Sequence, residues 1–213
     1  MDLIFIKGKI KRLMKLGPFG AFKCLYHRHK LKRLVENIGI DIDPWHIYNN
    51  FFCRYYKRIV VNIVNSLKPE IVVEVGCGIG EIISRVNAST KIGIDINSDL
   101  IKLAKIVNAE AEYIVGDFST ILSLPFNRID CLLTVGVIHG ISQDDLRNYI
   151  KSIIDKKKVK YILTDNYKES YPYKNKTYSH NLESYDERIT LLEIFDDGEG
   201  YRDFFLWRVD YER

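Results

Sequence analysis

Residues 71–80 read Ile-Val-Val-Glu-Val-Gly-Cys-Gly-Ile-Gly, and this stretch decides the predicted fold. Its first half is a short β-branched run, which is typical of a strand buried on both faces. Its second half places glycines at 76 and 78, where they permit a tight turn and let a ligand lie directly against the backbone. The stretch therefore predicts a central strand, a ligand-binding turn and a helix that follows the turn.

Further apolar runs alternate with helical patterns along the chain. The predicted strands are 91–95, 113–117, 129–135 and 159–164, and the predicted helices are 98–107 and 143–155. This alternation indicates a parallel sheet with helices on both faces. Two last apolar runs, 189–195 and 204–211, are joined through a turn that opens Asp-Asp-Gly and predict an antiparallel hairpin. The expected fold is α/β, a Rossmann-like three-layer sandwich whose mostly parallel seven-stranded sheet ends in that hairpin.

The region upstream of this sheet is predicted to be helical. Residues 1–40 carry a helical pattern broken near Gly17-Pro18-Phe19-Gly20. Asp43-Pro44 is a helix start signal, because Asp caps a helix and Pro fits its first turn. A single helix over 44–67 is expected to follow. We therefore divide the chain into a basic helical N-terminal arm, residues 1–43, and a ligand-binding domain, residues 44–213.

The positive charge of the chain is concentrated in this arm. The whole chain of 213 residues has a formal net charge of +4, whereas residues 1–33 hold ten Lys/Arg and the single acid Asp2. The arm fits three roles: it lies on an anionic membrane surface, contacts phosphates, or packs on the acidic body as a solvated helix. The side chains concerned are Leu3, Ile4, Phe5, Ile6, Ile10, Leu13 and Met14 with Lys7, Lys9, Lys11, Arg12 and Lys15.

Composition narrows the class of protein. Hydrophobic residues make up 46% and charged residues 28%, which excludes a disordered chain and a bundle of membrane spans. The first segment lacks the continuous apolar region of a secretory signal. The four cysteines (Cys24, Cys53, Cys77, Cys131) lack CxxC spacing, so we expect reduced thiols and no metal site. The expected location is cytoplasmic, with the arm peripheral to the inner face of the membrane.

Two carboxylates end the strands that neighbour the glycine turn. Asp95 lies 19 residues after Gly76, where such an acid accepts hydrogen bonds from ribose hydroxyls, and Asp117 ends the next strand. A GxGxxG motif would need glycine at 81, where this chain has Glu81. Glu74 and Glu81 flank the turn and oppose a pyrophosphate, because like charges repel strongly in a shielded site. They favour a cationic ligand, and S-adenosylmethionine carries a sulfonium, an ammonium and no phosphate.

These features together resemble a class I S-adenosylmethionine-dependent methyltransferase. The resemblance is carried by the E-x-G-x-G-x-G run at 74–80, the acid at 95, Gly-Asp at 116–117 and Asp-Cys-Leu-Leu-Thr-Val-Gly-Val-Ile-His at 130–139. It covers about residues 45–213 and implies S-adenosylmethionine as cofactor. By this resemblance the cofactor-binding residues are Glu74, Gly76, Cys77, Gly78, Asp95, Ile96, Asp117, Phe118 and Thr134. The resemblance places Ile96 and Phe118 on the adenine faces and Asp117 at the adenine amino group.

Methyl transfer to a hydroxyl needs a base that removes the proton as the new bond forms. His139 is the first candidate, because it follows the fourth strand at the rim and imidazole titrates near neutral pH. His180 is the second, within the polar, Tyr-rich stretch 165–188. The alternative role for His139 is structural packing. The alternative for His180 is that it is a solvated loop residue. His46 is expected to pack at a helix start or to close the pocket.

The sequence after strand four also bears on the methyl acceptor. Families that methylate nucleobase amino groups carry an Asn-Pro-Pro-Tyr run after strand four, where this chain has 134–139, Thr-Val-Gly-Val-Ile-His. The Tyr-rich stretch fits a sugar, and the chain is similar to methyltransferases of bacterial surface-polysaccharide biosynthesis. We expect O-methylation of a small molecule, nucleotide sugar or lipid-linked saccharide. An RNA methyltransferase and a non-catalytic cofactor-binding scaffold subunit stay open, although nucleic acid is not the expected partner.

Overall fold

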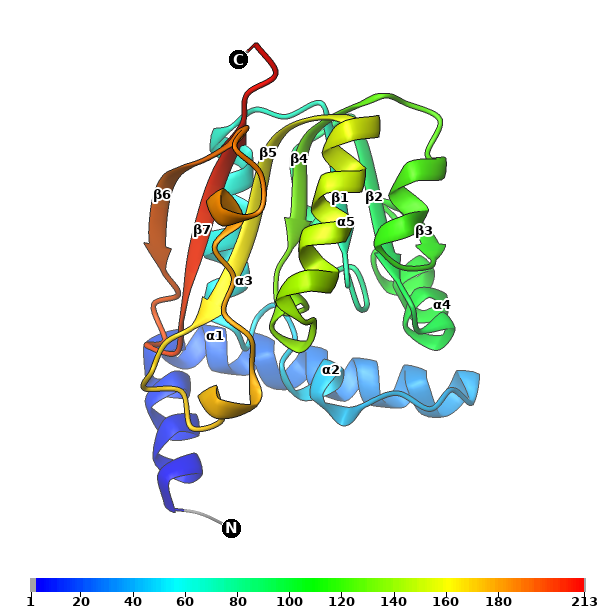
Figure 1. The fold of residues 1–213 in the computed structure, drawn as a ribbon. Coiled ribbons are helices and arrows are strands. Elements are labelled where there is room, and N and C mark those ends of the chain that lie inside the picture. The colour runs from blue at the N-terminus through cyan, green and yellow to red at the C-terminus, as the bar shows by residue number, and fades with distance from the viewer. Residues whose placement is uncertain (1–2, 213) are drawn as a thin grey trace.

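A computed structural model describes residues 3–212, with side chains from residue 16 onward. It contains a seven-stranded sheet in the order β3-β2-β1-β4-β5-β7-β6 (Figure 1). The strands are β1 (Ile71–Val75), β2 (Thr90–Asp95), β3 (Glu112–Val115), β4 (Arg128–Thr134), β5 (Lys158–Tyr167), β6 (Ile189–Asp196) and β7 (Arg202–Val209). The strands from β3 to β5 run parallel, and β7 pairs antiparallel with β5 and β6. The predicted Rossmann-like sandwich with its final hairpin is confirmed.

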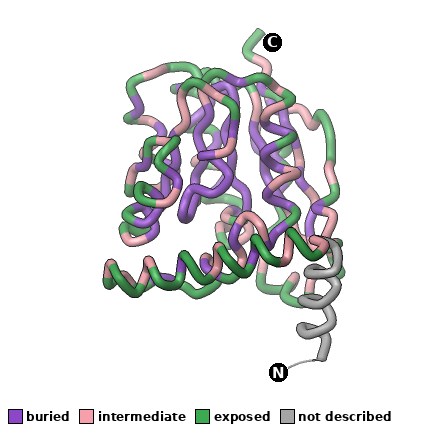
Figure 2. Tube along the Cα trace, turned by 180° about the vertical axis from the view of Figure 1, so that it is seen from behind, coloured by how far each residue is buried: buried purple, intermediate pink, exposed green. Residues whose placement is uncertain are grey.

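Helices cover both faces of this sheet. Alternate residues of a strand point to opposite faces, so Val72 and Val73 of β1 enter different apolar clusters. One face packs on α5 (Gln143–Lys156), and the other packs on α3 (Tyr55–Ser66) and α4 (Ser98–Val107). The central strands β1, β2, β4 and β5 carry the longest runs of buried residues (Figure 2). This double burial explains their uninterrupted β-branched and Leu-rich sequences.

Two helix predictions were wrong. The expected helix 44–67 is two helices, α2 (Pro44–Tyr48) and α3, because Asn50 forms a turn between them. The amide of Asn50 donates to the carbonyls of Cys24 and Ile47, and its oxygen accepts the backbone N–H of Phe52. After the glycine turn, a short 3-10 helix at Ile83–Arg85 replaces the expected full helix.

The N-terminal helix α1 (Leu3–Ile38) lies across the edge of the sheet at which the parallel strands end (Figure 1). It is kinked at Gly17, where φ is 64°, so the predicted break is confirmed. Asp43 caps α2 as predicted, because its Oδ1 accepts the Trp45 N–H at 2.7 Å. The side chains of residues 3–15, including the basic ones named above, lie outside the described part, and the domain boundary at residue 43 stays a prediction.

The expectation of four reduced thiols was wrong for two of them. Cys24 of α1 and Cys53 of the α2–α3 turn form a disulfide, whereas Cys77 and Cys131 are buried free thiols. The two bonded residues are 29 positions apart, and only the packing of α1 against this turn brings them together. Among residues 3–212, no helix combines the length and hydrophobicity that crossing a bilayer requires.

Candidate cofactor and active site

A cavity of about 360 Å³ lies at the carboxyl ends of the central strands. Its size falls within the range of roughly 300–1,000 Å³ that is usual for small-molecule sites. The lining residues are Trp45, His46, Tyr56, Lys57, Glu74, Gly76, Cys77, Gly78, Ile79, Glu81, Ile82, Val135, Gly136, His139, Tyr167, Tyr171 and Arg202. The predicted residues of the glycine turn therefore meet His139 in one cavity, as expected for strands that end at the same edge.

The glycine turn closes tightly against its neighbours. Gly76 has a φ of 71°, and a Cβ at this position would lie 1.9 Å from Cγ2 of Val137. Gly78 has a φ of 54°, and its Cβ would lie 3.1 Å from the imidazole of His46. His46 of α2 therefore forms the cavity wall that faces the glycine turn. This position corresponds to the expected role of closing the pocket.

Glu74 is the carboxyl group that precedes the glycine turn. Its side chain is buried, and one oxygen accepts the N–H of Ile83 at 3.0 Å. Burial raises the pKa of Glu74 to about 8, so the group is mostly protonated at neutral pH. A cation bound beside it would stabilise the carboxylate and lower this pKa.

Glu81 does not act as the sequence argument assumed. Its carboxylate pairs with Lys57 at 2.5 Å and also accepts the Phe51 N–H at 2.8 Å. The charge of Glu81 is thus neutralised within the protein. The electrostatic preference for a cationic ligand rests on Glu74.

We predict that Glu74 makes the stability of the protein depend on pH. Because its folded-state pKa of about 8 exceeds its ordinary value of 4.5, the folded state binds the extra proton between these values. The free energy of unfolding should fall as pH rises through this window, by up to about 1.4 kcal/mol per pH unit. Urea denaturation at a series of pH values should show this slope in the wild type and lose it in Glu74→Gln. The exposed Glu193→Gln is the control, and equal slopes in all three proteins would contradict the prediction.

Asp95, the residue predicted to bind the ribose, lies beside the glycine turn. Asp95 accepts the Gly78 N–H at 2.8 Å with one oxygen and the Asn97 N–H at 3.0 Å with the other. A carboxylate has about four acceptor positions, so Asp95 can still accept hydroxyl donors. Ile96 follows it and is 78% exposed, as a residue that covers a ligand from outside should be.

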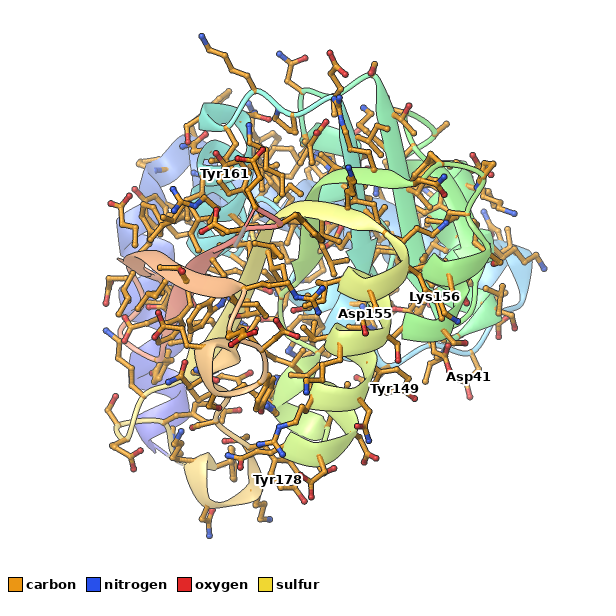
Figure 3. The ribbon with its side chains drawn as sticks, turned by 45° about the horizontal axis from the view of Figure 1, so that its top comes forward. Asp41, Tyr149, Asp155, Lys156, Tyr161 and Tyr178 are labelled. Carbon is orange, nitrogen blue, oxygen red and sulfur yellow. A yellow bond between two sulfur atoms is a disulfide. The ribbon has the colours of Figure 1, made fainter. Side chains whose placement is uncertain are left out.

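The other two predicted adenine contacts are placed differently. Asp117 caps the 3-10 helix Phe118–Ser123 and accepts both the N–H and the hydroxyl of Ser119. Phe118 is 3% exposed and stacks on Tyr149 of α5, which is labelled in Figure 3. Its ring faces are therefore used in the core and are not offered to an adenine. Sequence could not reveal this, because Tyr149 comes from a distant helix.

His139 lies in the cavity with an unused nitrogen. Its ring meets the Tyr167 ring edge-on at 4.9 Å, and its buried Nδ1 has no hydrogen-bond partner among residues 16–212. Burial lowers the pKa of His139, and the nearby Asp165 opposes this effect only in part. The imidazole is therefore neutral at pH 7 and able to accept a proton.

His180 and Thr134 do not line the cavity. His180 is 3% exposed, and both ring nitrogens are engaged: Nδ1 with the Tyr185 hydroxyl at 2.7 Å and Nε2 with the Ile138 carbonyl at 2.8 Å. These contacts hold the segment after β5 against the end of β4. Thr134 is fully buried, and its Oγ1 has no partner among the described side chains.

A buried ion pair, missed in the sequence, forms the far end of the cavity. Arg202 lies 2.7 Å from Asp165, donates to the Tyr167 hydroxyl at 2.9 Å and faces the rings of Tyr56 and Tyr167. Asp165 also accepts the Gly136 N–H at 2.7 Å. Asp165 follows the buried run of β5 and could have been noticed. Arg202 could not, because the antiparallel register of β7 on β5 places it there.

Residues 72–158 match the model of a family described as a methyltransferase domain. Residues 72–158 thus carry a methyltransferase domain, which supports the resemblance to class I S-adenosylmethionine-dependent methyltransferases. No curated protein matches it in sequence. S-adenosylmethionine is the cofactor of such a domain, and the residues present fit it. The glycine turn and the buried carboxyl of Glu74 line the cavity. Asp95 lies outside the cavity lining, but it holds the Gly78 N–H and keeps free acceptor positions.

Solved structures share the fold of the methyltransferase at low sequence identity. Magnesium protoporphyrin IX methyltransferase from Synechocystis, with bound S-adenosylhomocysteine, has a TM-score of 0.58 and 12% identity, over 89% of this chain and 99% of that one. The N-methyltransferase NodS from Bradyrhizobium japonicum has 0.62 and 14%, over 86% and 98%. A TehB-like methyltransferase from Corynebacterium glutamicum has 0.55 and 17%, over 85% and 96%.

Proposed function

We propose that the methyltransferase methylates a hydroxyl oxygen of a small molecule, most specifically of a saccharide intermediate in polysaccharide biosynthesis. The observation that carries this proposal is the shared cavity, in which the glycine turn and a neutral His139 with an unpartnered Nδ1 line the same space. A hydroxyl acceptor needs such a base. Among the described residues, the carboxylate at the far end of the cavity, that of Asp165, is paired with Arg202 and is not free to take this role.

The chemistry divides between cofactor and protein. When bound, S-adenosylmethionine supplies an electrophilic methyl group on a sulfonium. His139 then accepts the proton of the acceptor hydroxyl as the oxygen–carbon bond forms and the carbon–sulfur bond breaks. Glu74 balances cofactor charge, and the cavity walls fix the acceptor in line, an ordering that contributes up to roughly 7–11 kcal/mol in favourable cases.

The walls beyond His139 support a ring-shaped, uncharged acceptor group. The rings of Tyr167 and Tyr171 stack with their centres 3.9 Å apart, and both residues line the cavity together with Tyr56. The charges of Arg202 and Asp165 cancel within one pair, so this end attracts no phosphate by net charge. Aromatic faces with fixed donors are suited to a sugar ring, which has apolar C–H faces and hydroxyl edges. The expected site of action is the cytoplasm, at the inner face of the membrane.

Calorimetric titration with S-adenosylhomocysteine tests the cofactor half of the proposal. In Asp95→Asn we expect an affinity roughly 10–100-fold lower than in the wild type, because the residue loses charge toward both the ligand and the Gly78 N–H. Glu110→Gln, an exposed change nearby, should bind normally. An unchanged affinity in Asp95→Asn would exclude the assigned ribose contact.

A methyl-transfer screen tests the acceptor half. Nucleotide sugars, lipid-linked saccharides, phenols and RNA are offered with radiolabelled cofactor. Transfer to the saccharides supports the proposal. Transfer to RNA alone, or cofactor binding with no transfer to any acceptor, would favour an RNA methyltransferase or a non-catalytic scaffold subunit instead.

A further inference from the structure

Large apolar side chains gather on one exposed face of α1. Phe19, Phe22 and Tyr26 follow the helical spacing i, i+3, i+7 and are 71%, 66% and 57% exposed; Leu25 is 52% exposed. Figure 2 shows this part of α1 running along the outside of the molecule with exposed residues. Such a group of exposed apolar side chains is unusual on a monomer and marks a contact surface.

The same stretch is strongly basic. Residues 19–33 contain no acid and four exposed basic residues, Lys23, Lys30, Lys32 and Arg33; a fifth, Arg28, donates to the Tyr48 carbonyl on the body side. Residues 34–213 carry 22 basic and 27 acidic residues, a net charge of −5. The ammonium of Lys23 lies 4.5 Å from the centre of the Phe19 ring, so cation and aromatic ring share one surface. This separation of charge turns α1 toward any anionic surface and the body away from it.

The opposite side of α1 is fixed to the body at the cofactor end. Cys24 is joined to Cys53 by the disulfide, and Leu31 packs in one cluster with Ile79 and Leu103. Ile79 belongs to the glycine turn and lines the cavity. The exposed face of α1 is therefore held in a defined direction relative to the active site.

We propose that the face of α1 from Phe19 to Arg33 docks on the surface of an anionic phospholipid membrane. The aromatic rings and Leu25 enter the headgroup region, and the basic side chains extend to the lipid phosphates. A nucleic acid would use the positive charges and leave Leu25 and Phe19 without apolar contacts. A second copy of the chain would bring two faces of like charge together.

Docking in this direction places the carboxyl edge of the sheet, and with it the cavity, beside the bilayer (Figure 1). It deepens the proposed function, on which this step rests: the saccharide acceptor is one attached to a membrane lipid. The enzyme and its acceptor then encounter each other by diffusion in the plane of the membrane. The sugar ring reaches the cavity, and the lipid stays in the membrane.

Vesicle co-sedimentation of the full chain tests the docking face. The vesicles are phosphatidylcholine alone or phosphatidylcholine mixed with phosphatidylglycerol. We expect binding to the mixed vesicles only, lowered at least tenfold in Phe22→Ser/Tyr26→Ser by the loss of two apolar anchors. In Lys30→Glu/Arg33→Glu it should fall by roughly 25-fold or more, at about fivefold per basic residue.

Matched controls carry the same changes elsewhere. Leu192→Ser/Ile194→Ser alters exposed apolar residues of the edge strand β6, and Lys151→Glu/Lys156→Glu reverses two charges on α5, where Lys156 is labelled in Figure 3. Both should bind vesicles like the wild type. Equal binding to neutral vesicles, an equal loss in the controls, salt-sensitive binding to RNA without vesicle binding, or dimerisation through this face would overturn the proposal.

Titration with S-adenosylhomocysteine on every variant separates the two proposals. Normal cofactor affinity without vesicle binding overturns the docking face and leaves the proposed function standing. Vesicle binding by a protein that methylates no acceptor supports the docking face and overturns the proposed function.

Discussion

Replacing His139 by alanine should lower kcat about 10²–10⁴-fold, the usual contribution of a positioned general base. The imidazole lines the cavity, its Nδ1 is buried without a partner among the described residues, and its burial lowers its pKa. Among the described residues that line the cavity, the other imidazole is that of His46, and it packs against Gly78 at the cofactor end. The affinity for S-adenosylhomocysteine should stay within a few fold of the wild-type value, since the change leaves the glycine turn intact.

The pH dependence of kcat provides an independent readout of the same role. A base must be unprotonated, so the wild-type rate should fall only as pH drops below the lowered pKa of His139, which lies under the ordinary 6.5. His139→Gln should be slow at every pH and should lack this acidic limb. Radiolabelled methyl transfer to the acceptor from the screen measures both quantities.

His180→Ala is the informative comparison. Both nitrogens of His180 are hydrogen bonded away from the cavity, so this variant should lose thermal stability and keep the pH profile of the wild type. If His139→Ala turns over like the wild type, or if His180→Ala abolishes the acidic limb, the assignment of the base is refuted.

The fold could be read from the sequence because its signals are local. The β-branched run of β1, the glycine turn and the strand-end acids each lie within one short segment, and the parallel topology follows from their alternation. Predictions failed where one distant contact decides the outcome. Asn50 splits the expected helix by bonding to Cys24, and Phe118 turns its face to Tyr149.

The residues of the candidate site likewise fall into those that local sequence predicts and those that distant contacts decide. Glu74, Gly76, Gly78 and His139 follow strands directly, so their meeting at one edge was predictable. The far wall depends on pairing between β5 and β7 and on the return of the segment after Tyr167. That segment carries the exposed Tyr178 at the outside of the molecule (Figure 3) and stacks Tyr171 on Tyr167.

Removing the carboxylate of Asp165 should destabilise the protein by about 3–5 kcal/mol, the cost of leaving a buried charge without its partner. In Asp165→Ala the guanidinium of Arg202, 3% exposed, loses its counterion, and the Gly136 N–H loses its acceptor. Urea denaturation at pH 7 measures the change. Asp144→Ala, which breaks the exposed pair with Arg147, should cost at most about 1 kcal/mol.

The double variant Asp165→Ala/Arg202→Met tests whether the loss of stability comes from the unpaired charge or from the lost packing. An apolar replacement removes the unpaired charge, so we expect the double variant to be more stable than Asp165→Ala alone. It should still bind S-adenosylhomocysteine, because the glycine turn and Asp95 are untouched, and it should lose methyl transfer, because Arg202 also holds the Tyr167 hydroxyl that lines the acceptor end. A double variant that is no more stable than Asp165→Ala would show that the cost lies in packing and in the Gly136 contact. A double variant with full activity would show that the ion pair only supports the fold.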